Sequence, residues 1–435
     1  MGDAAIVKAE LDRFRHNTAG RVSPAWSTAH VRKALVELGD PQDHMPPAIH
    51  LTGTNGKGST GAFIRAMAEA AGLKVHVFTS PHLIRVNERI RVASRLVEDE
   101  ALADVLSDIA RRTQGLTYFE ALTAAAFCLF AQERADLCVI EVGAGGATDA
   151  TNVMSHPAAC VVTPISRDHE ALFGVSGVAA IARLKAGIFR DGSPVVIAEQ
   201  PALPLGVLRE EARLAGAPVL YAGEGWRSGW NDGAFVYAGR RLNVRAPWLG
   251  LPGAHQAQNA GAACAAIEVL NDRRITAEAM AVGLRECTWP GRLQQLKPGP
   301  LAGDGRVWID AAHNPGGATA LARAIKAGRE EGERVATVIA IQSAKDIVAV
   351  LAELKPETDL FVVCPLPDSG GQEGGAGADP LELAEAVKAL GGRVAIAGDL
   401  MEAVRIGREA ADRVYVAGSV YLCGTALSLN DERVE

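Results

Sequence analysis

The stretch IHLTGTNGKGST, residues 49–60, decides the fold because it joins a short apolar run to a glycine-rich turn and then to a helix. Apolar residues recur at helical spacing after the turn, as at Phe63, Ile64 and Met67. Gly72 follows where a helix-ending glycine is common. The turn is therefore predicted to lie between a buried strand and the amino end of a helix, where free backbone N–H groups hold phosphate oxygens.

The side chains of this turn fit a phosphate-binding loop, although two positions depart from the Walker A rule G-x-x-x-x-G-K-[ST]. Leu51 stands where the first glycine is expected, and Gly58 follows the lysine. Lys57 would bring a cation to the β- and γ-phosphates, and Ser59 or Thr60 can reach a magnesium ion. An ordinary strand–turn–helix joint explains the glycines but not the lysine and two hydroxyls, so a nucleotide site is predicted. Its predicted residues are Gly53, Thr54, Asn55, Gly56, Lys57, Gly58, Ser59 and Thr60.

Length and composition indicate a globular protein of two or three domains, since the chain has 435 residues, of which 48% are apolar and 22% charged. A net charge of −7 without a basic stripe argues against nucleic acid as a partner. No run of about 18 uncharged apolar residues occurs, and the amino terminus carries early charges, so we expect neither a membrane span nor a signal peptide. Seven scattered cysteines without a C-x-x-C pair predict reduced, buried thiols and a cytoplasmic location.

Strand-like and helix-like segments alternate over the first half of the chain. This alternation predicts a mostly parallel sheet covered by helices. Residues 218–247 are short, β-rich segments broken by turns, which predicts a small antiparallel appendage, and a helical block follows to about residue 286. The predicted strands are AIHLTG (48–53), KVHVFTS (74–80), LCVIEVG (137–143), ACVVTPI (159–165) and PVVIAE (194–199), and the predicted helices are 57–72, 98–112, 117–134 and 176–190.

A segment rich in Pro and Gly, WPGRLQQLKPGPLAGDG (289–305), is the best linker candidate. The alternation restarts after it and predicts a second, smaller, Rossmann-like doubly wound domain. The predicted α/β domains are thus 1–290, with the phosphate loop and appendage, and 291–435; the low-complexity segment 370–380 is predicted to be a mobile surface loop. The second domain's predicted strands are 306–312, 334–341, 359–365, 393–397 and 413–418, and its predicted helices are 315–330, 345–354, 380–390, 400–411 and 419–429.

Polar side chains follow two of the predicted strands in the first domain. Glu141 ends DLCVIE, and Asp168 and His169 follow an apolar strand. The carboxyl ends of parallel strands face the crevice where such folds bind ligands, so a magnesium site shared with the nucleotide is predicted. Histidine is the less usual magnesium ligand, and a hydrogen-bonded structural role is the alternative for His169 taken alone.

The second domain opens with WIDAAHNPGG (308–317), in which a strand is followed by a polar turn. Asp310 ends the strand, and His313 lies in the turn. Taken singly, Asp310 and Asn314 are ordinary helix-cap residues. Arg292, in the predicted linker segment, would reach a bound phosphate on domain closure, which predicts a reaction that needs closure.

Ten motifs occur together and in one order: GTNGKGST (53–60), TSPHL (79–83), ERI (88–90), LTYFEALTAAAF (116–127), EVGAGGATDATN (141–152), DH (168–169), KAGIF (185–189), HQAQNA (255–260), WPGR (289–292) and DAAHNP (310–315). This combination closely resembles the folylpolyglutamate synthase/dihydrofolate synthase family of the Mur ligase superfamily, from about residue 30 to about residue 430. The peptidoglycan Mur ligases carry Thr or Ser directly after the lysine. Gly58 is therefore the form of the loop that the resembled family uses.

The resemblance implies an ATP-dependent ligase that joins L-glutamate to dihydropteroate or a folate by an amide bond. ATP converts the pterin substrate's carboxylate into an acyl phosphate, the glutamate amine attacks it, and phosphate leaves. Such chemistry depends on positioning and charge cancellation. The resemblance also implies that Ser80, Glu141 and His169 hold magnesium, that Asn259, Arg292 and Asp310 contact ATP with His313 beside the site, and that Phe119, Glu120, Asp149 and Thr151 line the pterin side.

Lys185 borders the apolar face of a predicted helix formed by Ile181, Leu184 and Ile188. An unpaired ammonium there is costly, so a lowered pKa and a neutral amine are predicted. In the resembled family the matching lysine takes up carbon dioxide as a carbamate, which implies a second magnesium site. An ordinary ammonium paired with a carboxylate or phosphate is the alternative. With Lys57 and His313, Lys185 completes the predicted catalytic residues.

Several positions depart from the resembled family: Ala147 and Thr148 replace the usual segment after the glycines, Ala311 replaces Gly, Leu184 replaces Glu, and Arg167 precedes Asp168. These departures put substrate preference in doubt more than ATP chemistry. The segment 23–31 also matches the family's amino-terminal region weakly.

Two other functions share part of this motif set. A peptidoglycan-type Mur ligase has an extra amino-terminal domain of about 100 residues, whereas 52 residues precede Gly53 here. A non-catalytic nucleotide-binding module would not need Arg292, Asp310 and His313. The resemblance favours a monomer with both dihydrofolate synthase and folylpolyglutamate synthase activity, and it leaves open a monovalent cation, the folate form and the polyglutamate length.

Overall fold

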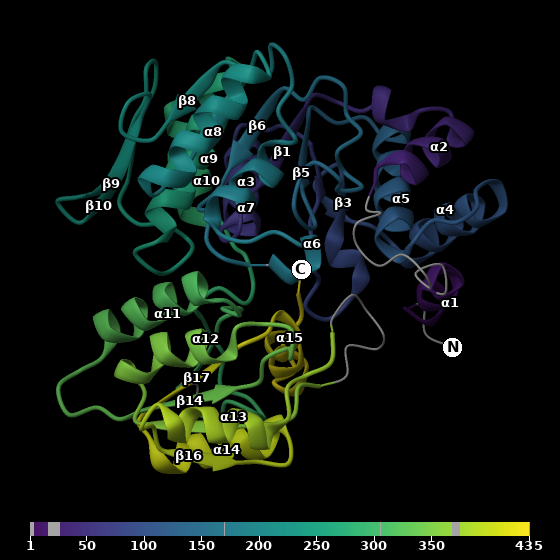
Figure 1. The fold of residues 1–435 in the computed structure, drawn as a ribbon. Coiled ribbons are helices and arrows are strands. Elements are labelled where there is room, and N and C mark those ends of the chain that lie inside the picture. Colours follow the sequence, from purple (N-terminus) through teal and green to yellow (C-terminus); the bar gives the residue numbers. More distant parts are fainter. Residues whose placement is uncertain (1–3, 16–26, 169, 305, 368–374, 435) are drawn as a thin grey trace. The chain divides into compact units, whose positions relative to one another are not determined.

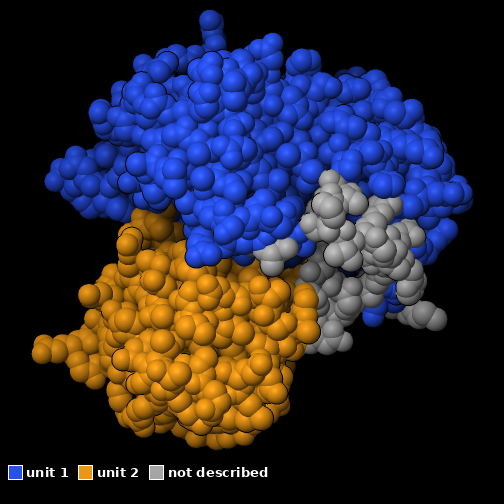
Figure 2. Space-filling view, in the orientation of Figure 1, with its two compact units in different colours: residues 1–81, 85–250, 256–288 blue, residues 82–84, 251–255, 289–435 orange. Residues whose placement is uncertain are grey.

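The chain forms two compact units, coloured separately in Figure 2. The computed structural model describes residues 4–15, 27–168, 170–304, 306–367 and 375–434. Each unit is built on a mostly parallel sheet covered by helices, so the predicted α/β fold class is confirmed. Unit 1 contains residues 1–81, 85–250 and 256–288, and unit 2 contains residues 82–84, 251–255 and 289–435.

Unit 1 contains an eight-stranded sheet in the order β4-β3-β2-β5-β1-β6-β7-β8 (Figure 1). Strands β2, β5, β1, β6, β7 and β8 pair in parallel, and the short strands β3 and β4 add an antiparallel edge. Every residue of β1 and β5 is buried, as expected for parallel strands covered on both faces. The strands are β1 (Ala48–Thr52), β2 (Val75–Phe78), β3 (Ile90–Val92), β4 (Arg95–Leu96), β5 (Leu137–Glu141), β6 (Ala159–Val162), β7 (Val195–Ile197) and β8 (Val219–Tyr221).

The helices of unit 1 bury their apolar faces in separate parts of its core. Helices α1, α2, α4 and α5 share one apolar cluster, α3 packs against α9 and α10, and α7 packs against α8. Helix α5 begins at a capping box, in which Thr117 accepts from the backbone N–H of Glu120 and the Glu120 carboxylate accepts from the N–H of Thr117. The helices are α1 (Ala4–Arg15), α2 (Ala29–Leu38), α3 (Lys57–Ala70), α4 (Asp99–Arg112), α5 (Tyr118–Gln132), α6 (Glu170–Phe173), α7 (Val178–Ala186), α8 (Ala202–Leu214), α9 (Gln256–Leu270) and α10 (Ala277–Glu286).

The appendage is a three-stranded antiparallel sheet of β9 (Arg227–Asn231), β10 (Ala234–Ala238) and β11 (Asn243–Ala246). The prediction that it starts near residue 218 was wrong, because β8 pairs in parallel with β7 and buries Leu220 at the edge of the large sheet. The appendage packs on α9: the Tyr237 hydroxyl donates to the Glu268 carboxylate at 2.7 Å. A Cβ on Gly261 would lie 2.6 Å from the indole of Trp226, so the helix approaches the appendage closely.

Unit 2 contains a six-stranded sheet in the order β12-β13-β17-β14-β15-β16. The segment 289–305 was predicted to be a linker, but this was wrong: it contains the edge strand β12, and Leu296 and Leu301 are buried in the core of unit 2. Burial of these two leucine side chains stabilises an ordered segment even though Pro and Gly surround them in the sequence. The predicted loop 370–380 lies partly outside the described residues. The elements are β12 (Gln294–Gln295), β13 (Val307–Ile309), α11 (Pro315–Gly328), β14 (Val335–Ile339), α12 (Ile347–Leu354), β15 (Leu360–Val363), α13 (Pro380–Ala389), β16 (Val394–Ile396), α14 (Leu400–Ala410), β17 (Arg413–Ala417) and α15 (Val420–Leu429).

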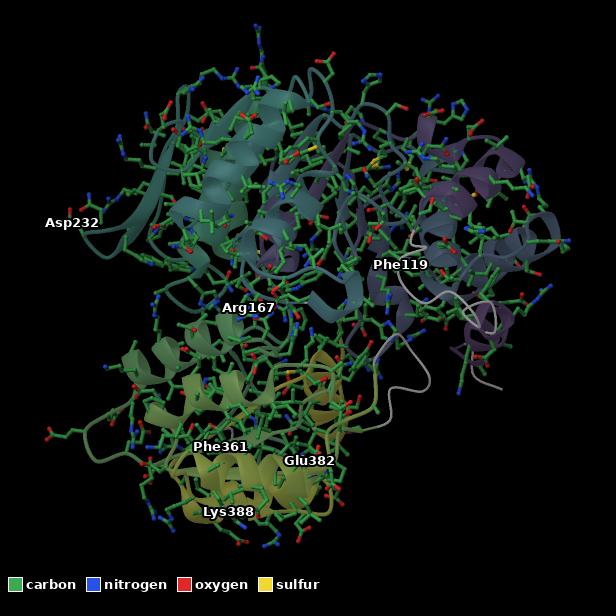
Figure 3. All side chains as sticks on the ribbon, in the orientation of Figure 1. Phe119, Arg167, Asp232, Phe361, Glu382 and Lys388 are labelled. Atoms are coloured by element: carbon green, nitrogen blue, oxygen red, sulfur yellow. The ribbon has the colours of Figure 1, made fainter. Side chains whose placement is uncertain are left out.

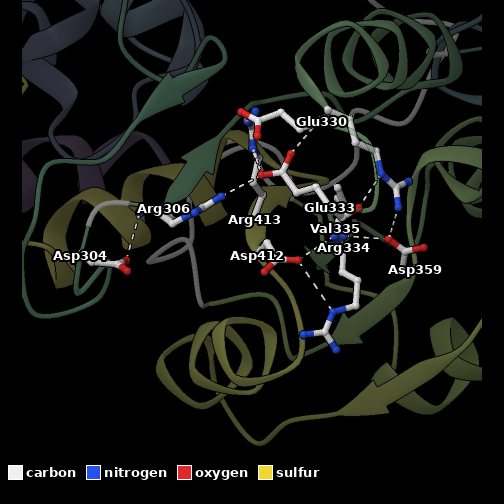
Figure 4. Close-up of polar contacts among 10 residues, drawn as sticks. Asp304, Arg306, Glu330, Glu333, Arg334, Val335, Asp359, Asp412 and Arg413 are labelled. Carbon is white, nitrogen blue, oxygen red and sulfur yellow. Dashed lines mark hydrogen bonds and ion pairs between the residues drawn. The ribbon is translucent and has the colours of Figure 1, made fainter.

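An ion-pair network joins the amino ends of the strands in unit 2 (Figure 4). The buried Glu333 carboxylate accepts hydrogen bonds from Arg306 at 2.8 Å and from Arg413 at 2.5 Å. Arg329 donates to Asp359 at 2.5 Å. These residues precede or begin β13, β14, β15 and β17, so the network fixes one edge of the sheet and leaves the opposite, carboxyl edge to the polar turn after β13.

Candidate active site

Four neighbouring strands of unit 1, in the order β2, β5, β1 and β6, end at the same edge of the sheet. Leu51 pairs with Glu141, and Thr52 pairs with Val162, so the residues that follow β1, β5 and β6 leave the sheet close together. The sequence predicts that this edge holds the nucleotide. The structure brings the phosphate loop, Glu141 and Lys185 together at this edge.

The phosphate loop has the shape that only glycine allows at two positions. Gly53 and Gly56 have positive φ angles, and a Cβ on Gly53 would lie 1.9 Å from the Thr163 hydroxyl oxygen. A Cβ on Gly56 would lie 2.3 Å from the Asn259 side-chain oxygen. The backbone N–H groups of Thr54 and Asn55 donate to Pro164 O at 3.0 and 3.3 Å, which fixes the loop to the segment after β6.

Lys57 begins α3 and turns back over the loop. Its ammonium donates to Gly53 O at 3.2 Å and Thr54 O at 3.4 Å, and lies 3.9 Å from the Glu141 carboxylate. Glu141 is 5% exposed. A buried carboxylate beside a lysine and a phosphate loop is chemically suited to a cation bound together with a polyphosphate.

Helix α9 supplies a second wall to the loop. The Gln256 side chain donates to the Ser59 hydroxyl at 3.5 Å, and Asn259 donates to Gln256 at 2.8 Å. Ser59 and Thr60 are both buried. Asn259 was predicted as an ATP contact and lies against Gly56; Gln256 was missed, although its position in HQAQNA three residues before Asn259 places both on one helix face.

Lys185 is buried and lies against the loop from α7. Its amine donates to Gly53 O at 2.7 Å. Burial lowers the pKa of Lys185 to about 7, and the charge of Lys57 acts in the same direction, while Asp168 and Asp149 oppose it. The amine is therefore largely unprotonated slightly above neutral pH, as the sequence predicted.

A glycine-rich turn after β5 packs against both α5 and α7. A Cβ on Gly143 would lie 2.4 Å from the Phe119 ring, and a Cβ on Gly146 would lie 2.8 Å from the carbonyl oxygens of Leu184 and Lys185. Figure 3 labels Phe119, whose ring centroid lies 5.8 Å from that of Phe78. The turn therefore fixes the position of Phe119 relative to Lys185.

Asp149 and Thr151 are buried and form hydrogen bonds that stabilise this turn. Asp149 accepts hydrogen bonds from the N–H of Ala144 at 2.9 Å and from the hydroxyl of Thr151 at 2.6 Å. That Phe119, Glu120, Asp149 and Thr151 line the pterin side stays a prediction. In the structure the Glu120 carboxylate caps α5.

Two of the predicted metal ligands, Glu141 and Ser80, have oxygen donors at the carboxyl edge of the sheet. Glu141 ends β5, and Ser80 lies two residues beyond the end of β2, the strand that pairs with β5. His169 lies outside the described residues. Within the described ranges no group of three His, Cys, Asp or Glu side chains is placed to hold a metal by itself. The carboxylate and hydroxyls nonetheless fit magnesium, which keeps several ligands from water and nucleotide phosphates.

The predicted residues of unit 2 form their own cluster at the carboxyl end of β13. The Asp310 carboxylate accepts from the N–H groups of Leu293 at 2.8 Å and Ala312 at 2.9 Å. Asp310 thereby holds the backbone next to Arg292, whose guanidinium donates to Gly291 O. Burial lowers the pKa of His255, Arg292 acts in the same direction and Asp310 opposes it, so His255 is a member of this cluster that sequence reasoning missed.

The other two polar residues of this turn have distinct local roles. The ring of His313 donates through Nδ1 to Ala311 O at 2.8 Å. The Asn314 side chain accepts from the N–H of Gly317 and caps α11, so its reading as a cap residue is confirmed. Asp310 was also read as a cap residue when taken singly, and the structure places it before the cap.

Two departures from the resembled family have clear surroundings. Ala147 donates its N–H to Leu184 O, and a Cβ on Gly187 would lie 2.3 Å from the Ala147 methyl group. Arg167, labelled in Figure 3, donates to Glu170 at 2.9 Å and is exposed. Neither side chain contacts Lys57 or Glu141 in any hydrogen bond or ion pair of the described residues.

Residues 51–267 match the Mur ligase middle domain, and residues 291–420 match the Mur ligase glutamate ligase domain. The chain is 33% identical over 393 residues to the dihydrofolate synthase/folylpolyglutamate synthase of Escherichia coli, which covers 89% of this chain and 87% of that relative. It spans 50% of the length of the halobacterial folylpolyglutamate synthase/dihydropteroate synthase that it matches.

Two solved structures extend the likeness to the fold. An Escherichia coli protein in complex with DHPP and ADP has a TM-score of 0.86 at 29% identity, covering 98% of this chain and 97% of that one. A Yersinia pestis folylpolyglutamate synthase/dihydrofolate synthase complexed with AMPPNP and an Mn ion has a TM-score of 0.83 at 28% identity, covering 97% of each chain. The resemblance read from the motifs is confirmed: the chain belongs to the folylpolyglutamate synthase/dihydrofolate synthase family of Mur ligases, which are ATP-dependent glutamate ligases.

Proposed function

We propose that this chain joins L-glutamate by an amide bond both to dihydropteroate and to folates, with ATP as the phosphoryl donor and ADP and phosphate as products. The observation that carries the proposal is the arrangement in unit 1 of Lys57, Glu141 and a buried Lys185 around one phosphate loop. Family membership supports the choice of glutamate and a pterin as the substrates.

The chemistry needs an activated carboxylate, because a free carboxylate is a poor electrophile. The substrate carboxylate attacks the γ-phosphorus of ATP, and ADP leaves. The glutamate amine then attacks the acyl carbon, and the tetrahedral intermediate expels phosphate. Lys57 balances charge on the transferred phosphoryl group, and the backbone of the loop holds the remaining phosphates.

Magnesium, when bound, would cancel negative charge on the β- and γ-phosphates. Ser80, Glu141 and His169 would hold one ion. Lys185 would hold a second ion as its carbamate, which turns a cation on a long stem into an oxygen ligand. The location of its amine at the loop and its pKa of about 7 support this assignment, because only the neutral amine takes up carbon dioxide.

The remaining residues divide between the nucleotide and the pterin. Asn259 lies beside the loop glycine Gly56 and contacts ATP in this proposal, as do Arg292 and Asp310, with His313 close by. Phe119, Glu120, Asp149 and Thr151 line the pterin side. The reaction therefore depends on residues of both units.

A coupled assay of ADP release tests the proposal. We expect release only when L-glutamate and either dihydropteroate or a reduced folate are both present, and mass spectrometry should find a glutamate adduct of each. If ADP is released at the same rate without the pterin and glutamate, the proposed function is wrong. The chain would then be a different ligase or a nucleotide-binding module. An adduct of one pterin class alone would refute the proposed bifunctionality.

We also place the chain in a reducing compartment, the cytoplasm, as a monomer. All seven cysteines are free and buried, which supports the compartment. None of the described helices is long and apolar enough to cross a membrane. Light scattering of the purified protein tests the monomer, and a dimer at micromolar concentration would contradict it.

A further inference from the structure

Strand β1 has one polar face although every residue in it is buried. Side chains alternate along a strand, so His50 and Thr52 share a face while Ile49 and Leu51 share the other. The Thr52 hydroxyl donates to Gly145 O at 3.0 Å, and His50 Nε2 lies 2.9 Å from the Thr151 hydroxyl oxygen. Both polar side chains of the strand thus form hydrogen bonds to the glycine-rich turn or to the segment that follows it.

The direction of the hydrogen bonds follows from counting protons. The Thr151 hydroxyl has one proton and donates it to the Asp149 carboxylate at 2.6 Å, so it accepts from His50. Burial lowers the pKa of His50 to about 3, and the charge of Arg190 acts in the same direction, so the ring is neutral with its proton on Nε2. The chain of donors runs from His50 through Thr151 to Asp149.

Asp149, the last member of this series of hydrogen bonds, fixes the glycine-rich turn that packs against Phe119, a residue proposed to line the pterin side. The second Asp149 oxygen accepts from the N–H of Ala144, which follows Gly143, and Gly143 packs on the ring of Phe119. His50 therefore acts on Phe119 through two side chains and one backbone contact. The backbone N–H of Thr151 also donates to Asp149 at 3.0 Å, and the bond from His50 adds a restraint on the orientation of the Thr151 hydroxyl.

The phosphate loop is held by different partners. Thr54 and Asn55 bond to Pro164 O, and the side chain of Thr54 bonds to Ser166 O at 3.0 Å. The hydrogen bonds that link His50, Thr151 and Asp149 do not include Thr54, Asn55 or Pro164. The hydrogen bonds from His50 to Asp149 therefore differ from those that hold Thr54 and Asn55 of the phosphate loop.

We infer that His50 is a positioning residue for the pterin substrate: it fixes Asp149 and the glycine-rich turn through Thr151 and sets the affinity for the pterin without setting the affinity for ATP. This inference rests on the proposed function. His50 touches no reacting atom, so its effect is on KM for one substrate.

The test compares His50→Leu with His50→Gln, which restores a side-chain N–H donor near the position of Nε2. We expect His50→Leu to raise KM for dihydropteroate about tenfold and KM for ATP less than about twofold. His50→Gln should recover most of this loss. Thr151→Val, which removes the hydroxyl and keeps the shape, should give a similar rise, and His50→Leu combined with Thr151→Val should add little to either single change.

A matched control is His76→Leu. His76 is also a fully buried histidine with a pKa lowered by burial, on β2, but it bonds to Glu133 O and the N–H of Ala93. We expect His76→Leu to lower the melting temperature without changing the ratio of the two KM values. If His50→Leu does not fold, Thr151→Val carries the comparison.

Two results would overturn the inference. One is an unchanged KM for dihydropteroate in both His50→Leu and Thr151→Val; the other is a parallel rise of both KM values, which would indicate general loosening. A wild-type chain that forms no glutamate adduct would instead refute the proposed function, so the two failures are distinguishable.

Discussion

The side-chain nitrogen of Lys185 donates a hydrogen bond of 2.7 Å to the carbonyl oxygen of Gly53, the first residue of the phosphate loop. A lysine amine in water has a pKa of about 10.4, whereas burial lowers that of Lys185 to about 7. The residue is therefore held at the loop in a state that can be cationic or neutral around physiological pH.

The first prediction concerns modification of this amine. In bicarbonate buffer at about pH 8 Lys185 should carry one carbon dioxide, and at about pH 6 it should not, because the protonated amine is unreactive. Native mass spectrometry or a crystal structure at each pH checks this. An unmodified amine in an active, ATP-bound enzyme at the higher pH would rule out the carbamate, and Lys185→Ala should abolish ligation with partial recovery in small carboxylates.

The second prediction concerns stability in buffer free of carbon dioxide. Below about pH 7 the folded state carries the full cost of a buried ammonium, and between about 7 and 10.4 the unfolded state binds more protons, so stability rises with pH. Lys185→Met should therefore be more stable than the wild type by roughly 2–4 kcal/mol near pH 6, with the difference shrinking toward pH 10. Urea unfolding at several pH values measures it.

The control for this experiment is Lys388→Met. Lys388, labelled in Figure 3, is exposed on α13 and pairs with Glu385 at 2.8 Å. Its substitution should shift stability by less than about 0.5 kcal/mol at every pH. A Lys185→Met difference that is constant with pH would show that the ammonium is not destabilised in the fold.

The third prediction concerns Gly56. Gly56→Ala should abolish ADP binding, because the new methyl group would lie 2.3 Å from Asn259 and the residue has a positive φ. Gly72→Ala is the matched control: it also has a positive φ, but nothing lies within 4 Å of its Cβ. It should lose about 1 kcal/mol of stability and keep ADP binding. Calorimetric titration measures the affinity of each variant for ADP. An equal loss of ADP affinity in Gly56→Ala and Gly72→Ala would contradict the steric argument.

The fourth prediction concerns Arg292. Arg292→Ala should lower kcat at least about 100-fold with stability changed by less than about 0.5 kcal/mol, since its described hydrogen bond is to Gly291 O. Arg405→Ala serves as control, because Arg405 is exposed and pairs with Glu409 on α14. Turnover of Arg292→Ala near the wild-type value would remove this residue from the reaction.

Most strands and helices were predictable from the sequence, but helices α1, α2 and α8 of unit 1 were not among those predicted. All five predicted strands of unit 2 are present, as are the helices between them. The β3–β4 hairpin was missed because its turn, at Ala93 and Ser94, has positive φ angles without the glycine or asparagine that signals such a turn. The edge strand β12 was missed because its Pro- and Gly-rich surroundings resemble a linker.

The candidate site divides in a similar way. Lys57 and Glu141 were predicted because a motif and a strand end marked them, and Lys185 because it borders the apolar face of a helix and matches a family motif. Their mutual distances depend on the pairing of β1 with β5 and β6. The role proposed for His50 was missed although this residue stands in the opening stretch. A histidine in the middle of an apolar, fully buried strand was the available signal, since a buried polar group needs a partner.

The close packing of α9 on the appendage has an optical consequence. Trp226 is 3% exposed and lies on Gly261, two residues along the helix from Asn259, which borders Gly56. A small shift of this helix, such as one that follows loading of the loop with nucleotide, would change the surroundings of a buried indole. We therefore expect the emission of Trp226 to change when nucleotide binds, and comparison with a Trp226→Phe variant would separate its signal from that of the other five tryptophans.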